Sequence, residues 1–113
     1  MHELSMMQQV LETVEGQASA QNASRVHSVT LRIGALSGVV PDALRFAFEC
    51  LAPGTRAEGA ALVIEEPPVP CYCRSCQRAF ETKTVQFQCP ACGGVEVELR
   101  GGQEMTIVSM EVS

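Results

Sequence analysis

The sequence predicts an α+β protein with a small mixed sheet of about three strands, two helices and an inserted four-cysteine module. Three observations predict this class. Helix-like and strand-like spacing of apolar residues alternates before residue 66, five of the six cysteines fall between Cys71 and Cys92, and a strand pattern returns after them. A chain of 113 residues accommodates one compact domain with at most a small satellite module.

Two segments carry the spacing of amphipathic helices. Apolar residues recur every three or four positions over Leu4–Ala18, which predicts a helix that ends near Ala20. Pro41 suits the first turn of a second helix, and Pro53-Gly54 ends it. The apolar face of this shorter helix consists of Leu44, Phe48 and Leu51.

Alternating apolar and polar residues predict strands at 26–33, 60–65 and 105–112. In the first strand, His27 shares a parity with Val29, Leu31 and Ile33, which favours a hydrogen-bonded core or edge histidine over a metal ligand. In the last strand one face is predicted to hold Val108, Met110 and Val112.

A segment of different character separates the last two of these strands. It begins with the stiff sequence Pro-Pro-Val-Pro at 67–70 and ends before Gly101-Gly102. We therefore predict a discontinuous α+β domain, formed by residues 1–66 and 101–113, and an inserted module at 67–100.

The inserted module contains two C-x-x-C pairs separated by twelve residues. Each pair can place two thiolates on one ion, and both pairs complete the closed tetrahedral S₄ shell of a structural zinc site. The segment is too small to bury a core of its own, so zinc supplies folding energy to a zinc ribbon-like module with a hairpin built on Phe80, Val85 and Phe87. The expected ligands are Cys73, Cys76, Cys89 and Cys92.

The other cysteines have separate explanations. Cys71 lacks the spacing of a ligand pair and is left out of the site, and Cys50 is most simply a small buried hydrophobe. Metal-free or redox-active C-x-x-C pairs are the alternative to zinc, but a thioredoxin-like motif would open a helix in a βαβ unit.

Composition and charge exclude several functions. A net charge of −5 would repel a phosphate backbone, and no apolar run reaches the roughly 20 residues of a membrane span. Met1-His2-Glu3-Leu4 lacks the basic flank of a secretory signal, so we expect a cytoplasmic protein. No phosphate-cradling loop or catalytic triad is visible and the S₄ shell has no open position, which argues against an enzyme.

The first three residues directly precede the first predicted helix. Methionine aminopeptidases accept only small second residues, so we expect Met1 to be retained. Its amine, the His2 amide and the His2 imidazole can fold around one ion as a planar nitrogen set that suits Ni(II) or Cu(II). Amides at a helix start have no intrahelical acceptor, so coordination there sacrifices no helical bond. From the residues alone, a solvated N-terminal histidine remains the commoner explanation.

The start Met1–Ser5, the segment Arg32–Pro41 and the two cysteine pairs, the second followed by Gly93, together resemble the HypA/HybF family of hydrogenase maturation factors. The similarity spans essentially the whole chain. A four-cysteine module alone is generic, but its combination with a Met-His-Glu start through this core is specific.

The resemblance implies a nickel metallochaperone that helps a GTPase maturation partner to insert Ni(II) into the large subunit precursor of [NiFe]-hydrogenase. It implies that His2 is a nickel ligand, with the Met1 amine and the Glu3 backbone contributing, and that the four paired cysteines bind Zn(II). Residues 1–66 and 101–113 then form the nickel-binding domain, and residues 67–100 form the zinc-binding module. We expect no nucleic-acid or membrane partner and a monomer or weak homodimer.

Two alternatives come from other classes. One is a zinc-ribbon adaptor that binds nucleic acid or protein without a nickel role; the charge of −5 and the low aromatic content oppose nucleic-acid binding. The other is a small redox protein that uses Cys71, Cys73 and Cys76. Thiol titration separates the redox alternative, because a zinc-loaded S₄ site leaves only Cys50 and Cys71 reactive.

Overall fold

The computed structural model describes residues 2–83 and 88–113. Met1 and the predicted hairpin residues Val85 and Phe87 lie outside the described residues. The chain divides into two compact units, the first formed by 1–32, 39–65 and 106–113 and the second by 33–38 and 66–105. None of the described helices is long and apolar enough to cross a membrane. In chain order the elements are α1 (His2–Ala20), β1 (Val26–Ile33), α2 (Pro41–Leu51), β2 (Ala61–Glu65), β3 (Val69–Cys73), β4 (Arg78–Thr82), β5 (Val97–Leu99) and β6 (Met105–Val112).

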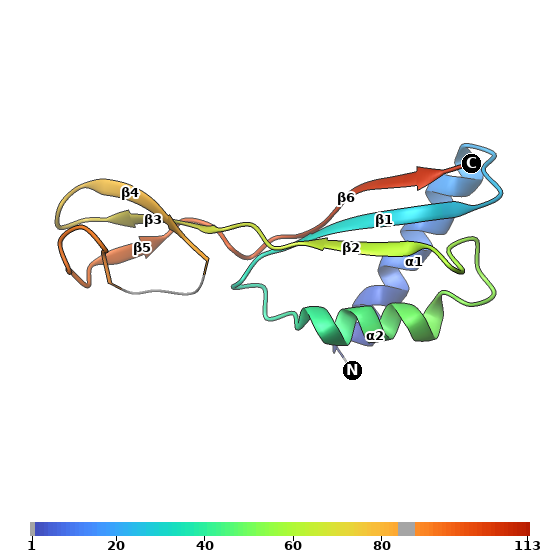
Figure 1. Ribbon diagram of the computed structural model, residues 1–113, viewed down its shortest axis with the longest axis horizontal. Helices are drawn as coiled ribbons and strands as arrows, with labels where there is room; N and C mark the ends of the chain where they lie inside the picture. Colours follow the sequence, from blue (N-terminus) through green and yellow to red (C-terminus); the bar gives the residue numbers. More distant parts are fainter. Residues whose placement is uncertain (1, 84–87) are drawn as a thin grey trace. The chain divides into compact units, whose positions relative to one another are not determined.

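The first unit contains a three-stranded sheet in the order β2-β1-β6 (Figure 1). β1 and β2 are parallel, with Ser28 opposite Ala61 and Arg32 opposite Glu65. Arg25 and Ser113 exchange two backbone hydrogen bonds of 3.2 and 3.0 Å, which is the pairing of antiparallel strands. The sheet is therefore mixed and three-stranded, and with the two helices it confirms the predicted α+β class.

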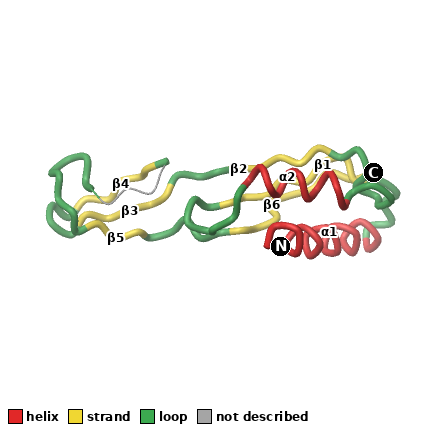
Figure 2. The backbone as a smooth tube through the Cα atoms, turned by 90° about the horizontal axis from the view of Figure 1, so that it is seen from below, coloured by secondary structure: helices red, strands yellow, loops and turns green. Residues whose placement is uncertain are grey.

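Both helices pack against this sheet and against each other (Figure 2). The amphipathic pattern of α1 is confirmed, because its buried residues recur at the predicted three- and four-residue steps. α2 begins with Pro41, whose missing N–H costs no hydrogen bond in a first turn. The largest fully buried side chains of the unit are Met7, Val14, Val26, Val29, Leu31 and Leu44.

Two side chains of the sheet are more exposed than the alternating pattern predicts. His27 is exposed although it shares a parity with Val29, but its Nε2 lies 2.6 Å from Ser113 Oγ, so the predicted hydrogen bond of this histidine is confirmed. Val108 is 41% exposed, whereas Ile107 and Met110 are half-buried. The less exposed side chains of β6 thus switch from odd-numbered to even-numbered positions in the middle of the strand. A strict alternation over the whole strand therefore assigns Val108 to the wrong face.

The second unit contains an antiparallel sheet in the order β4-β3-β5. It also includes residues 33–38 and 101–105, which are predicted from the sequence to belong to the discontinuous α+β domain. Backbone hydrogen bonds explain this grouping: Gly34 N donates to Glu104 O at 2.8 Å, and Leu36 N donates to Gly102 O. A Cβ at Gly34 would lie 2.2 Å from Gly102 O, so only glycine permits this close approach.

Candidate metal centre

The four cysteines of the C-x-x-C pairs converge in the second unit. One sulfur from each residue lies within 4.8 Å of all the others. Cys73 Sγ is 3.6 Å from Cys92 Sγ, and Cys76 Sγ is 3.8 Å from Cys89 Sγ. A tetrahedron with Zn–S bonds of about 2.3 Å has edges of about 3.8 Å, so this sulfur cage has the size of a Zn²⁺ shell. The chain thus has a four-cysteine metal-binding site, and its donor set fits zinc.

The backbone turns in the same way after each cysteine pair. Gln77 and Gly93 each follow the second cysteine of a pair, and both have positive φ, 57° and 72°. At the second turn Gly93 N donates to Cys89 O at 2.8 Å, and Gly94 N points at Cys92 Sγ at 3.4 Å. Gly93 therefore occupies the left-handed position, which glycine adopts without steric cost.

The thiols of the cage differ in pKa. Backbone N–H groups of Cys92 and Ala91 hold the pKa of Cys89 at about 7, although desolvation opposes this. Burial, together with hydrogen bonds to the other thiols, raises the pKa of Cys76 to about 12. Four thiolates this close repel one another, so a divalent cation is the natural partner that lets all four ionise.

Cys71 and Cys50 lie outside the cage. Cys71 is 2% exposed, and its Sγ lies 3.5 Å from Val69 O. Cys50 is exposed, and the prediction that it is buried is wrong. α2 turns Leu44, Ala47 and Phe48 to the core, and Cys50 falls on the opposite side of the helix.

The chain start forms a second polar cluster, in the first unit. His2 opens α1 with its side chain 62% exposed, and His2 Nδ1 lies 3.7 Å from Glu3 Oε2. The same Glu3 oxygen accepts a 3.3 Å hydrogen bond from Val40 N, and the pKa of Glu3 is lowered by its own backbone N–H and by that of Val40. Sequence reasoning missed this contact, because it joins residues 37 positions apart.

The fold and the cage define the class of protein: a small metal-binding α+β protein with a closed four-thiol site on a separate ribbon. Residues 1–112 match the family described as "Hydrogenase/urease nickel incorporation, metallochaperone, hypA". The chain belongs to the HypA family of nickel metallochaperones, which are maturation factors and not enzymes.

Individual relatives agree over their full length. The chain is 44% identical to "Hydrogenase maturation factor HypA" of Picosynechococcus sp. and 40% identical to "Hydrogenase maturation factor HypA 2" of Bradyrhizobium diazoefficiens, with 99% of both chains covered in each case. Its fold is similar to the solution structure of the Ni metallochaperone HypA from Helicobacter pylori, with a TM-score of 0.64, 24% identity, and coverage of 97% of this chain and 96% of that one. The resemblance read from the sequence is thereby confirmed.

Proposed function

We propose that this protein binds Ni(II) at the start of its chain in the cytoplasm and delivers it, with a maturation GTPase, to the precursor of the [NiFe]-hydrogenase large subunit. Nickel is the cargo, and zinc in the cysteine cage is the structural metal. The observation that carries the proposal is the position of His2, exposed at the first turn of α1 in a chain that belongs to a nickel-incorporation family.

The chemistry of the chain start supports nickel as cargo. The amine of Met1 and the amide and imidazole of His2 supply adjacent nitrogen donors, which suit a planar Ni(II) complex. An amide must be deprotonated to coordinate, and at a helix start this costs no helical hydrogen bond. The backbone of Glu3 completes the proposed set of nickel ligands, while its carboxylate accepts a hydrogen bond from Val40 N. Exposure of His2 leaves the ion within reach of a receiving protein.

Zinc in the cage has a structural role in this proposal. A closed S₄ shell leaves no position for a substrate, so this metal stabilises the second unit and does not react. We propose Cys73, Cys76, Cys89 and Cys92 as its ligands.

Calorimetric nickel titration tests the cargo site. Four proteins are compared: wild type, His2→Ala, a form with two residues added before Met1, and His27→Ala as a control. The additional residues convert the terminal amine into an amide, and His2→Ala removes the imidazole, so both changes should weaken Ni(II) binding at least tenfold. His27→Ala removes the chain's other histidine and should bind as wild type does.

Zinc content and helicity, measured in each protein, should not change, because none of the substitutions touches a cysteine. Binding by the wild type should also weaken in acid, since only a neutral imidazole coordinates. If the extended form binds Ni(II) as tightly as the wild type, the chain start is not the nickel site.

A further inference from the structure

One long edge of the sheet in the first unit has no neighbouring strand. β6 is an outer strand in the order β2-β1-β6, and within residues 2–83 and 88–113 only β1 pairs with it (Figure 1). Successive residues of a strand direct their backbone N–H and C=O groups alternately to its two sides, so about half of the eight residues of β6 direct theirs to the open side. Val112 is one of them, because the adjacent Ser113 exchanges its hydrogen bonds with Arg25.

β6 lacks the features that keep edge strands from pairing with other chains. Natural edge strands are short, or they carry charges and prolines. β2, the opposite edge, fits this description, because it has five residues, ends at Glu65 and continues with Glu66 and Pro67. β6 is longer and contains no proline, lysine or arginine, and its one charged residue is Glu111. This edge is therefore suited to pairing with a further strand.

A groove of about 280 Å³ lies between this edge and α1. Its lining residues come from both elements and include Gln17 and Gln21 of α1 and Val108 and Met110 of β6. No lining residue is charged, although the chain contains eight basic and thirteen acidic residues. A charged side chain that entered the groove would lose its hydration without gaining an ion pair. An apolar side chain would instead cover Val108, which is 41% exposed.

We propose that β6 binds an extended, uncharged segment of another protein, which adds to the sheet as a fourth strand. Backbone hydrogen bonds to the open side of β6 supply the affinity in this mode of recognition. Alternate side chains of an added strand point to the same face of the sheet, so those on the side of α1 enter the groove. The uncharged lining of the groove determines the chemistry of the partner: an apolar residue at the position beside Val108 and no charge next to it.

The proposed surface is separate from the chain start. Thr13, the lining residue nearest to His2 in sequence, follows it by 11 residues along α1, which is about 16 Å along the helix axis. A bound segment therefore leaves His2 accessible, and the inference does not depend on the nickel proposal.

Binding of capped peptides to the zinc-loaded full chain tests this inference. The probe has seven residues that alternate between threonine and valine. One control peptide carries lysine in place of its central valine, and the other is N-methylated at its three central residues, which removes N–H groups from both of its edges. The probe should shift the amide NMR signals of residues 106–112 and slow their hydrogen exchange, with a dissociation constant below about 1 mM. Both controls should bind at least tenfold more weakly, the lysine peptide in spite of the net charge of −5.

Val108→Lys and Val63→Lys form a matched pair of variants. The two valines are 41% and 46% exposed and lie on opposite edge strands, so both substitutions add one positive charge to an edge. Val108→Lys places its charge in the groove and should weaken binding of the probe at least tenfold, whereas Val63→Lys should leave binding unchanged. Circular dichroism and zinc content confirm that each variant is folded.

Three results would overturn the proposal. The first is a wild type that does not bind the probe at millimolar concentration, and the second is equal binding of the methylated and unmethylated peptides or equal weakening by both variants. The third is a shift of the amides of residues 106–112 with protein concentration alone, which would assign this edge to a second copy of the chain.

Discussion

At the scale of single residues, the two residues with positive φ that follow the cysteine pairs differ in the free-energy cost of their backbone conformation. A side chain in the left-handed region costs roughly 1–2 kcal/mol, which Gly93 avoids and Gln77 incurs. Gln77→Gly should stabilise the zinc-loaded second unit by ~0.5–1 kcal/mol, and Gly93→Ala should destabilise it by ~1 kcal/mol. Amide hydrogen exchange of residues 67–83 and 88–100 measures both changes. Destabilisation by Gln77→Gly would contradict the strain argument.

Glu98 has a pKa that neighbouring arginines lower, and a titration can measure this shift. Hydrogen bonds from Arg74 and Arg100 lower the pKa of Glu98 from 4.5. Because the folded pKa lies below the unfolded one, the ion pairs stabilise the second unit above pH 4.5 and are lost as the pH falls through the lowered value. Carbon NMR titration of zinc-loaded Arg74→Gln should show the pKa of Glu98 rising. Arg78→Gln, on β4, is the control and should leave it unchanged.

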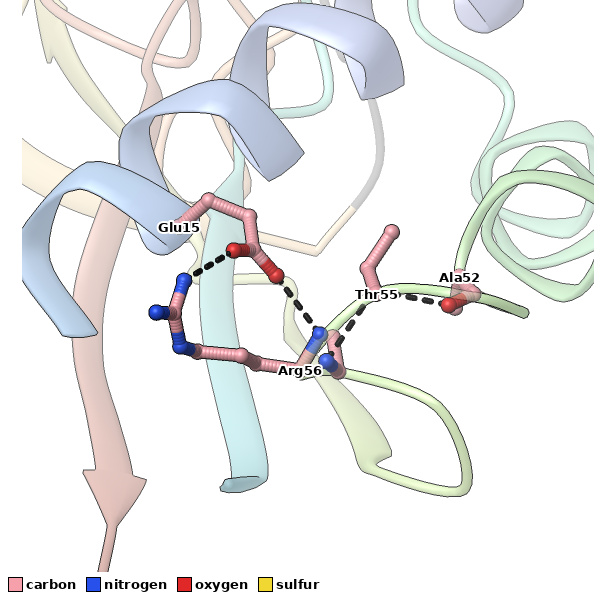
Figure 3. A network of polar contacts seen from close by, with 5 residues as sticks. Glu15, Ala52, Thr55 and Arg56 are labelled. Carbon is pink, nitrogen blue, oxygen red and sulfur yellow. Dashed lines mark hydrogen bonds and ion pairs between the residues drawn. The ribbon is translucent and has the colours of Figure 1, made fainter. Parts of the chain in front are cut away.

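At the scale of elements, one acidic residue joins α1 to the loop after α2 (Figure 3). Glu15 Oε1 accepts from Arg56 N, and Glu15 Oε2 accepts from Arg56 Nη1, both at 2.6 Å. Thr55 organises the same loop, since its hydroxyl donates to Ala52 O at 2.7 Å and accepts from Ala57 N at 3.0 Å. The loop therefore has a fixed conformation that fits the Glu15 carboxylate.

Glu15→Gln should lower the free energy of unfolding of the first unit by ~1–2 kcal/mol, because an amide cannot accept both donors with the strength of a carboxylate. Glu12→Gln removes an exposed carboxylate one turn earlier and should change stability by less than about 0.5 kcal/mol. Urea unfolding followed by helical circular dichroism measures both. If both substitutions changed the free energy of unfolding equally, the change would come from the net charge and not from the contacts of Glu15.

At the scale of the whole molecule, the two units depend on different forces. The first unit buries Met7, Val14, Leu31 and Leu44 between its helices and sheet. Within residues 66–83 and 88–105, the fully buried side chains are small by comparison: Val69, Cys71 and Cys73. We therefore expect the second unit to depend on a bound metal for folding, and the first unit to fold without one.

Cys73→Ser should therefore abolish zinc binding and disorder the second unit while the first stays folded. Metal analysis should fall from one zinc per chain to none, and amide NMR signals of the second unit should collapse to random-coil positions. Cys50→Ser, which changes an exposed cysteine outside the cage, should keep both zinc and order. A zinc-free Cys73→Ser protein with an ordered second unit would contradict this dependence.

The sequence by itself determined the two helices, the three strands of the first unit and the cage, because all of these depend on local spacing. β6 begins and ends at the predicted residues, Met105 and Val112, and two C-x-x-C pairs bring four sulfurs together wherever the module lies. Tertiary structure alone decided three features: the exposure of Cys50, the hydrogen bond between Val40 N and the Glu3 carboxylate, and the grouping of residues 33–38 with the second unit. These depend on how a helix rotates and on which distant backbone groups meet, and a local pattern specifies neither.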